Sequence, residues 1–145
     1  MLVRDILSTK QIAKIISVAT TDKISVAAEL LSEMRIGAVI VRDKGNEMDG
    51  ILSERDIVRE LGRSGTGCLT QTVSELMTTN VKFCAPTDTT QQVMQMMTDG
   101  RFRHMPVMDD GKLVGVISIG DVVAARIKEV QFENDSMADL IAGNI

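Results

Sequence analysis

The chain has 145 residues, 44% of them hydrophobic and 25% charged, which is typical of one folded globular domain and not of a disordered chain. Its formal net charge of −4 provides no positive field for a polyanion, so nucleic-acid binding ranks last among the functions considered. The first ten residues lack a signal-peptide core and no run of about twenty apolar residues occurs, so we expect a cytoplasmic protein without membrane contact.

The first half of the chain predicts a short opening segment, a helix, two strands and a second helix. Apolar residues recur at helical spacing over residues 26–34, and two short apolar runs separated by a polar turn indicate strands. A glycine-rich stretch at the end has the composition of a flexible connector. A plain loop is preferred there over a phosphate-binding glycine loop, because no strand precedes the glycines and no Gly-Lys-Ser/Thr follows. The predicted elements are the opener Val3–Leu7, the helix 26–34, the strand Ala38–Val41, the turn Asp43–Asp49, the strand Gly50–Leu52, the helix Glu54–Leu61 and the connector Gly62–Gly67.

The second half repeats this pattern at a shift of 65 or 66 residues, so one unit occurs twice along the chain. Residues 93–97 have helical apolar spacing with Asp88 and Gln91 as the predicted cap, and Thr72 with Glu75 predicts a capping box for the second opener. Neither unit is long enough to bury its own apolar face, so we expect them to share one core about a pseudo-twofold axis. The predicted divisions are a first repeat with its opener and linker over residues 1–67, a second repeat over 68–132, and a tail or short helix over 133–145.

Each repeat carries the motif Gly-apolar-apolar-Ser-x-x-Asp where its second strand meets a helix. The serine and aspartate are spaced as helix N-cap and N3 residues, so a capping pair alone is a sufficient explanation. Both copies would also face the cleft between the repeats, where a carboxylate accepts the two hydroxyls of a ribose while the serine and helix amides hold phosphate. The motif by itself weights the two interpretations equally. The copies are Gly50–Asp56, with Ser53, and Gly115–Asp121, with Ser118.

Positive charge gathers in the second repeat, just before the apolar run Met105–Val107. Arg101, Arg103 and His104 provide donors for phosphate there, although a solvated basic turn is the plain alternative. We therefore expect the site centred on Asp121, with Arg103 and His104, to bind more tightly than its counterpart. The matching positions of the first repeat are Arg35, Gly37 and Ala38.

Nothing in the sequence indicates catalysis, and the chain is predicted not to be an enzyme. His104 is the only histidine and has no recognisable spacing to a serine nucleophile. Cys68 and Cys84 cannot build a zinc cluster or a disulfide framework, so we expect no metal and two reduced thiols. Because Tyr and Trp are absent, a single purine would be held by aliphatic and Met side chains such as Ile15 or Val81, although methionines more often fill cores.

The doubled pattern resembles the tandem CBS-domain family, over nearly the whole chain. The resemblance rests on the openers ending at Leu7 and Met77, the strand Arg103–Asp109, and the closing motifs at Gly50 and Gly115. It implies an α+β fold of two β-α-β-β-α repeats packed through their sheets, often in a disc-shaped homodimer. It also implies an adenosine ligand and no required cofactor, with AMP the first candidate and ADP, ATP, NAD or S-adenosylmethionine the others.

The resemblance further implies which residues contact the ligand. The first copy departs from the family at Ile40, which stands where the second copy has Pro106, so the first site is expected to be degenerate. The implied contacts are Asp121 and Asp56 for ribose, Ser118 and Ser53 for phosphate or ribose, Thr79, Asn80, Val81, Met105 and Pro106 for the base and backbone, and Lys14, Ile15 and Ile16 in the first copy. The basic cluster adds Arg103 and His104 for phosphate, and its matching position in the first repeat adds Ala38.

Two functions from different classes follow. The preferred hypothesis is a regulatory, energy-sensing module, in which an adenosine nucleotide changes how the two units or two chains pack and an unidentified partner protein reads the change. The alternative is a structural or oligomerisation module with vestigial sites, in which Ser-x-x-Asp only caps helices. A nucleotide titration distinguishes them, because a bound ligand must stabilise the folded state.

Overall fold

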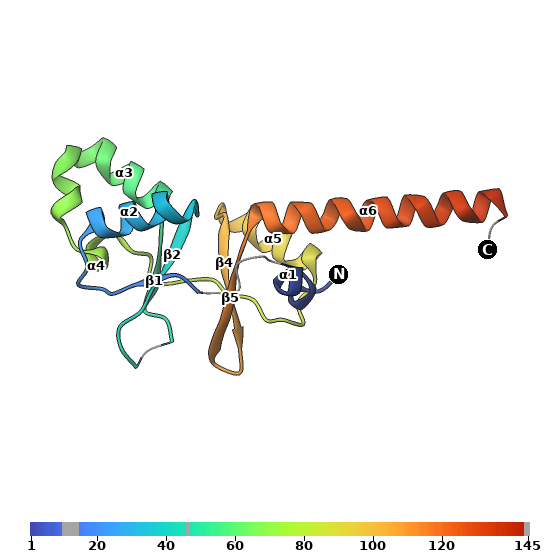
Figure 1. Cartoon of the computed structure of the whole chain (residues 1–145), viewed down its shortest axis with the longest axis horizontal. Coiled ribbons are helices and arrows are strands. Elements are labelled where there is room, and N and C mark those ends of the chain that lie inside the picture. Colours follow the sequence, from blue (N-terminus) through green and yellow to red (C-terminus); the bar gives the residue numbers. More distant parts are fainter. Residues whose placement is uncertain (10–14, 46, 144–145) are drawn as a thin grey trace.

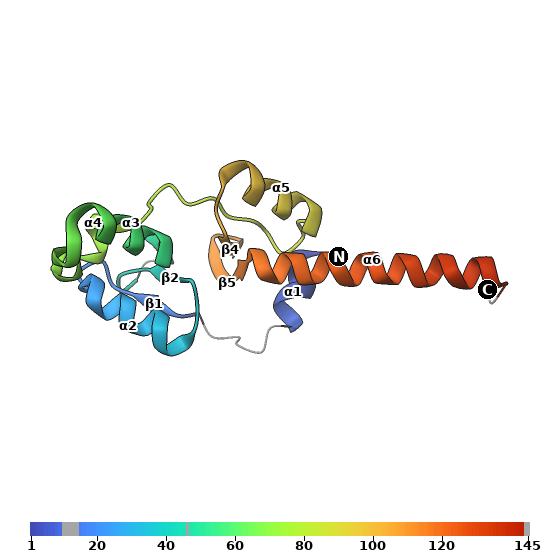
Figure 2. The same ribbon diagram turned by 90° about the horizontal axis from the view of Figure 1, so that it is seen from above.

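A computed structural model describes residues 1–9, 15–45 and 47–143. Two small sheets stand next to each other in the middle of the molecule, and the helices lie on their outer sides (Figures 1 and 2). The predicted α+β fold of two β-α-β-β-α repeats packed through their sheets is confirmed. The region between the two sheets is therefore where the repeats can share a site.

The first sheet has three strands in the order β1-β2-β3. β1 (Ser17–Val18) runs parallel to β2 (Ala38–Val41), and helix α2 (Ile24–Met34) makes the crossover that a parallel pair requires. β2 pairs antiparallel with β3 (Gly50–Ser53), which leads directly into α3 (Glu54–Ser64). All four residues of β2 are buried because it is the central strand.

The second repeat has the same order of elements as the first, but its sheet has fewer strands. β4 (His104–Asp109) and β5 (Lys112–Ser118) pair antiparallel through a tight turn at Asp110 and Gly111, which both have positive φ, as a two-residue hairpin turn requires. α5 (Thr90–Gly100) precedes them and α6 (Ile119–Ala142) follows. The counterpart of β1 is a single parallel bridge between Cys84 and Val107.

The two opening segments exchange places between the repeats. α1 (Val3–Thr9) places Val3 and Ile6 in the core of the second repeat, and the Val3 N–H donates to the Asp88 carbonyl at 2.9 Å. α4 (Val73–Leu76) joins the core of the first repeat, where the Val73 N–H donates to the Asp22 carbonyl at 2.8 Å. Each opener thus packs in the core of the other repeat. The division at residue 67 therefore follows the repeat in the sequence but does not separate the two cores.

This exchange explains the first glycine of each closing motif. A Cβ at Gly115 would lie 2.7 Å from Leu7 Cδ2, and a Cβ at Gly50 would lie 2.6 Å from the Thr78 carbonyl oxygen. Real Cβ atoms do not approach so closely, so a side chain at residue 50 would require the backbone to shift, and one at residue 115 would require the Leu7 side chain to move.

Of the two predicted helix caps, one is confirmed and the other is wrong. The Thr72–Glu75 box is present, with the Thr72 N–H donating to the Glu75 carboxylate at 3.1 Å. The predicted cap of α5 is wrong by one residue, because Thr89 caps the helix with Gln92 at N3. Asp88 instead accepts from the Ala85 N–H at 2.8 Å, closing the turn before the helix.

Two further predictions are corrected. The connector Gly62–Gly67 is helical, since α3 continues to Ser64 and a 3-10 helix, η1 (Gly65–Thr70), follows around the buried side chain of Cys68. The segment after residue 132 is not a separate short helix but the end of α6, which runs without a break to a glycine cap at Gly143. No helix in the described ranges is long and apolar enough to cross a membrane.

Candidate ligand-binding site

A cavity of about 690 Å³ lies between the two repeats, within the range of roughly 300–1,000 Å³ usual for small-molecule sites. Its wall on one side is the end of α2 with the start of β2, and on the other β5 with the first three turns of α6. Thr9 at the end of α1 and Ile15 before β1 also line it. The cavity therefore takes residues from both halves of the chain.

The start of α6 presents the second Ser-x-x-Asp motif to this cavity. The Ser118 N–H donates to Asp121 Oδ2 at 2.9 Å, and the Asp121 N–H donates to Ser118 Oγ at 3.1 Å. This reciprocal capping box holds the carboxylate in one position at the positive end of the helix dipole. The capping interpretation is thus confirmed, and it does not compete with ligand binding because both side chains also line the cavity.

Three side chains that can carry positive charge line the same cavity. Arg35 comes from the end of α2, Lys128 from the third turn of α6, and His104 from the first residue of β4. Among the described residues that line the cavity, Asp121 is the single carboxylate. Two permanent cations and one carboxylate suit a ligand that carries both an anionic group and hydroxyl donors.

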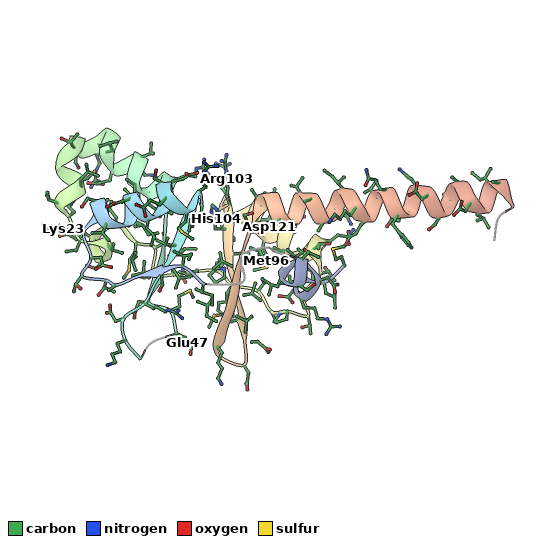
Figure 3. All side chains as sticks on the ribbon, in the orientation of Figure 1. Lys23, Glu47, Met96, Arg103, His104 and Asp121 are labelled. Carbon is green, nitrogen blue, oxygen red and sulfur yellow. The ribbon has the colours of Figure 1, made fainter. Side chains whose placement is uncertain are left out.

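His104 lies directly over the backbone of Gly37 in the other repeat. A Cβ at residue 37 would be 2.7 Å from His104 Cε1 and 2.8 Å from its Nε2. Gly37 is therefore needed for the imidazole to reach across the interface. Figure 3 shows His104 and Asp121 where the β4–β5 sheet meets α6. His104 therefore lines the cavity and also lies against the other repeat.

Arg35 sits in an unusual backbone conformation. It is the C-cap of α2 with φ 54° and ψ 46°, the left-handed region that favours glycine. Arg101 has the same role at the end of α5, with φ 56° and ψ 39°. This conformation costs an arginine about 1–2 kcal/mol. The cost indicates a functional role for the Arg35 side chain, which a substitution can test.

The structure brings together six of the fifteen predicted contact residues. They come from the segment before β1, the start of β2 and the second copy of the closing motif with its neighbouring strand. The six are Ile15, Ile16, Ala38, His104, Ser118 and Asp121. Lys14 lies outside the described residues.

The other predicted residues do not line this cavity. Met105 is fully buried in the core of the second repeat, and Pro106 is buried beside it in β4. Ser53 and Asp56 form the capping box of α3, with the Ser53 N–H donating to Asp56 Oδ2 at 2.9 Å. The remaining four are Thr79, Asn80, Val81 and Arg103.

The sequence predicts Arg103 beside Asp121, and of these two residues only Asp121 lines the cavity. The carbonyl of Arg103 accepts from the Ile119 N–H at 2.7 Å and so ties β4 to the start of α6, but its side chain is exposed and outside the cavity. Arg35 of the other repeat does line the cavity. Residues 15–16, before β1, and 35–38, from the end of α2 to the start of β2, line the same cavity as Asp121.

Lys128 was missed in the sequence, although a signal for it exists. It stands seven residues after Asp121 on one helix, and residues seven apart share a helix face. Ala124 and Ala125 lie between them on that face, and their short side chains leave space in the cavity.

Neither cysteine lines this cavity, and the described ranges contain no candidate metal centre. Burial, assisted by the Asp88 carboxylate, raises the pKa of the Cys84 thiol to about 12, so the thiol is neutral at physiological pH. Cys84 and Cys68 are both free and buried. In the described part of the chain, no three His, Cys, Asp or Glu side chains come close enough to hold a metal ion.

A model of the CBS domain family matches residues 3–63 and 73–128. Among curated proteins, the chain is 34% identical over 128 residues to the CBS domain-containing protein CBSX3, mitochondrial, of Arabidopsis thaliana. That match covers 86% of this chain and 62% of the relative, and the match to CBSCBSPB3 of the same plant covers only 23% of that protein. The chain thus spans less than two thirds of these relatives.

Solved structures agree in fold over most of their length. The CBS-domain containing protein ATU1752 from Agrobacterium tumefaciens is 44% identical with a TM-score of 0.83, covering 87% of this chain and 99% of that one. The CBS domain pair of protein MJ0100 is 25% identical with a TM-score of 0.77, covering 89% of this chain and 98% of that one. The MJ0100 structure is a complex with 5-methylthioadenosine and S-adenosyl-L-methionine.

Proposed function

Because the chain belongs to the CBS-domain family, as a tandem pair that forms a regulatory module, we propose that it binds an adenosine nucleotide in the cavity between its repeats and does not catalyse a reaction. The observation that carries the proposal is the placement of Asp121, held by its capping box, opposite Arg35 of the other repeat. AMP is the first candidate ligand, with ADP, ATP and NAD as the others. A homodimer and a cytoplasmic location are part of the proposal.

The charges of the cavity support this class of ligand. The Asp121 carboxylate can only accept hydrogen bonds, which suits the two adjacent hydroxyls of a ribose. Arg35 and Lys128 are exposed cations that suit phosphate oxygens. Two cations against one carboxylate also favour an anionic nucleotide over the positively charged sulfonium of S-adenosylmethionine.

The apolar lining supports an adenine ring. Ile15, Ile16 and Val116 provide aliphatic surface on both sides of the cavity, and Ala38 at the start of β2 leaves room between them. Aliphatic walls with a few fixed polar groups are the usual composition of a small-molecule site. The adenosine compounds bound to MJ0100, a structural neighbour of this chain, agree with that choice.

A regulatory response follows from which elements the ligand would contact. Ligand that bridges Arg35 in one repeat and Asp121 in the other binds one relative position of the repeats better than others, and so shifts the population toward it. A partner protein that contacts either repeat can detect this shift.

The direct test is thermal unfolding in the presence of AMP, ADP, ATP, NAD and S-adenosylmethionine. A ligand at about one hundred times its Kd stabilises the folded state by about 2.7 kcal/mol, which raises the Tm by roughly 5–10 °C for a domain of this size. Asp121→Asn keeps an oxygen for the Ser118 N–H but turns the other acceptor into a donor, so we expect it to lose most of the shift.

The matched control is Asp56→Asn, which makes the same change in the first copy of the motif, outside the cavity. It should respond to nucleotide like the unchanged protein. No Tm shift with any adenosine compound at millimolar concentration would overturn the proposal in favour of the structural module. Equal responses from both variants would place the ligand away from Asp121.

A further inference from the structure

Helix α6 carries an apolar stripe that no other part of the described chain covers. Its second half extends beyond the body of the molecule in both views (Figures 1 and 2). The side chains of Met137 and Ile141 are 59% and 81% exposed. Along the helix the stripe follows alternating steps of four and three residues, the heptad spacing of a two-stranded coiled coil. Its residues are Val123, Ile127, Val130, Asn134, Met137 and Ile141, all exposed.

The stripe is separate from the face of α6 that packs on the protein. Val122 and Ala125 are buried on the body side. At about 100° per residue, the centre of the stripe lies about a third of a turn or slightly more from that side. A second helix can therefore run beside α6 for about 27 Å without displacing any of its contacts to the body.

The end of α6 requires such a partner more than the start does. Most of the stability of a helix in a protein comes from packing an apolar face, and short isolated helices are marginal in water. Beyond Glu129, which contacts Thr90 and the amino group of Met1, no hydrogen bond or ion pair is recorded from α6 to the rest of the described chain. Apolar side chains nevertheless continue at heptad spacing up to Ile141.

Asn134 identifies the partner as a second copy in parallel orientation. Val123, Val130 and Met137 take the d positions, and Ile127, Asn134 and Ile141 the a positions. A single asparagine at an a position is the feature that specifies a register and a dimer in parallel coiled coils. The amide has both donors and an acceptor, so it is complementary to itself when the two helices lie in register.

The residues that flank the stripe carry no charge that opposes this pairing. In a parallel dimer each g position faces the e position five residues later on the other helix. Arg126 then faces Gln131 and Glu133 faces Ala138, so no like charges meet.

We propose that two copies of the chain associate through α6, from Val123 to Ile141, as a parallel coiled coil in register at Asn134. The proposal specifies an interface for the homodimer of the proposed function but does not depend on nucleotide binding. The first test is the molar mass in solution, by light scattering and sedimentation, of the full chain and two lysine variants. Met137→Lys places a charge in the stripe, and we expect it to weaken the dimer at least tenfold.

Phe132→Lys is the matched control, because Phe132 is also exposed, by 74%, but lies at an f position on the opposite side of the helix. It should leave the dimer unchanged. A monomeric parent protein, or equal effects of the two lysines, would overturn the proposal. Nucleotide-induced Tm shifts measured on both variants stay informative whichever result is found, since the cavity contains neither residue.

Orientation is tested by oxidative crosslinking of Met137→Cys. The native Cys68 and Cys84 are buried and should not react. In a parallel dimer the two introduced thiols meet across the axis, so we expect rapid formation of a disulfide-linked dimer, and Phe132→Cys should give none. Failure of Met137→Cys to crosslink in a sample shown to be dimeric would exclude the parallel register.

Discussion

Arg35 and Arg101 show how two equivalent residues can differ in function. Both end the first helix of their repeat in the left-handed region, at φ 54° and 56°, where glycine would be less strained. Only Arg35 lines the cavity that contains Asp121. The shared conformation does not explain why arginine stands at both positions, whereas the proposed phosphate contact would explain Arg35.

Replacing Arg35 with glycine separates these roles. We expect the free energy of unfolding to change by less than about 1 kcal/mol, because relief of the left-handed strain offsets the greater entropy of glycine in the unfolded chain. Nucleotide affinity, measured by calorimetry, should fall at least fivefold. Arg101→Gly should have a similar effect on stability and leave affinity unchanged; equal affinity losses would contradict a role for Arg35 in the cavity.

Residue types with a local role were predictable from the sequence. The Ser-x-x-Asp pairs cap α3 and α6 as their spacing indicates. The residues that share a cavity with each motif were not predictable. In a chain with two repeats, a segment of the first repeat can lie beside the motif of its own repeat or beside that of the other. The position of α1 decides this, and that position depends on packing between distant parts of the chain.

At the scale of elements, the exchange of openers explains why the two glycines differ in tolerance. The atom nearest to a Cβ at Gly50 is a backbone oxygen, Thr78 O, which also accepts from the Ile51 N–H at 3.0 Å. The atom nearest to a Cβ at Gly115 is the end of a flexible side chain, Leu7 Cδ2. Backbone must shift in the first case and only a rotamer in the second.

We therefore expect Gly50→Ala to destabilise the protein by about 2–3 kcal/mol and Gly115→Ala by about 1 kcal/mol. Urea unfolding at pH 7 measures both values. An equal or reversed order would mean that α4 does not approach β3 as closely as the structure has it.

Glu129 ties α6 to α5 and to the amino group of Met1. Its carboxylate accepts from Thr90 Oγ1 at 2.9 Å, from Arg126 and from the Met1 amino group at 2.7 Å. Burial acts to raise the pKa of Glu129, but these hydrogen bonds outweigh it, so the pKa lies below its usual value. A lowered folded pKa stabilises the protein above the unfolded value, near 4.3, and this contribution is lost as the pH falls through the folded pKa.

Glu129→Gln should accordingly reduce the free energy of unfolding by about 1 kcal/mol at pH 7 and much less at pH 3. Urea unfolding of both proteins across this pH range provides the measurement. A difference that stays constant with pH would show that the carboxylate charge contributes nothing there.

Elements with strong local signals were predicted well, and the errors have physical causes. The helices and strands of both repeats follow apolar spacing and turn residues. The connector Gly62–Gly67 was misjudged because its glycines suggested flexibility, whereas burial of Cys68 stabilises a 3-10 helix there. The continuity of α6 could have been predicted, since no proline or glycine interrupts it between Gly120 and Gly143.

At the scale of the whole molecule, α6 connects the two proposed sites. Ala124 and Lys128 face the cavity, and Ile127 between them belongs to the stripe proposed to pair with a second copy. A ligand that shifts the start of α6 therefore changes the angle at which two copies can pair. Linkage requires the reverse as well, so dimer formation should alter nucleotide affinity by the same factor.

A crystal structure of the chain grown with AMP tests the central claim most directly. The account predicts one nucleotide between the repeats, with its ribose hydroxyls within hydrogen-bond distance of the Asp121 carboxylate and its phosphate against Arg35 or Lys128. AMP bound elsewhere, or a cavity that stays empty at saturating AMP, would contradict it.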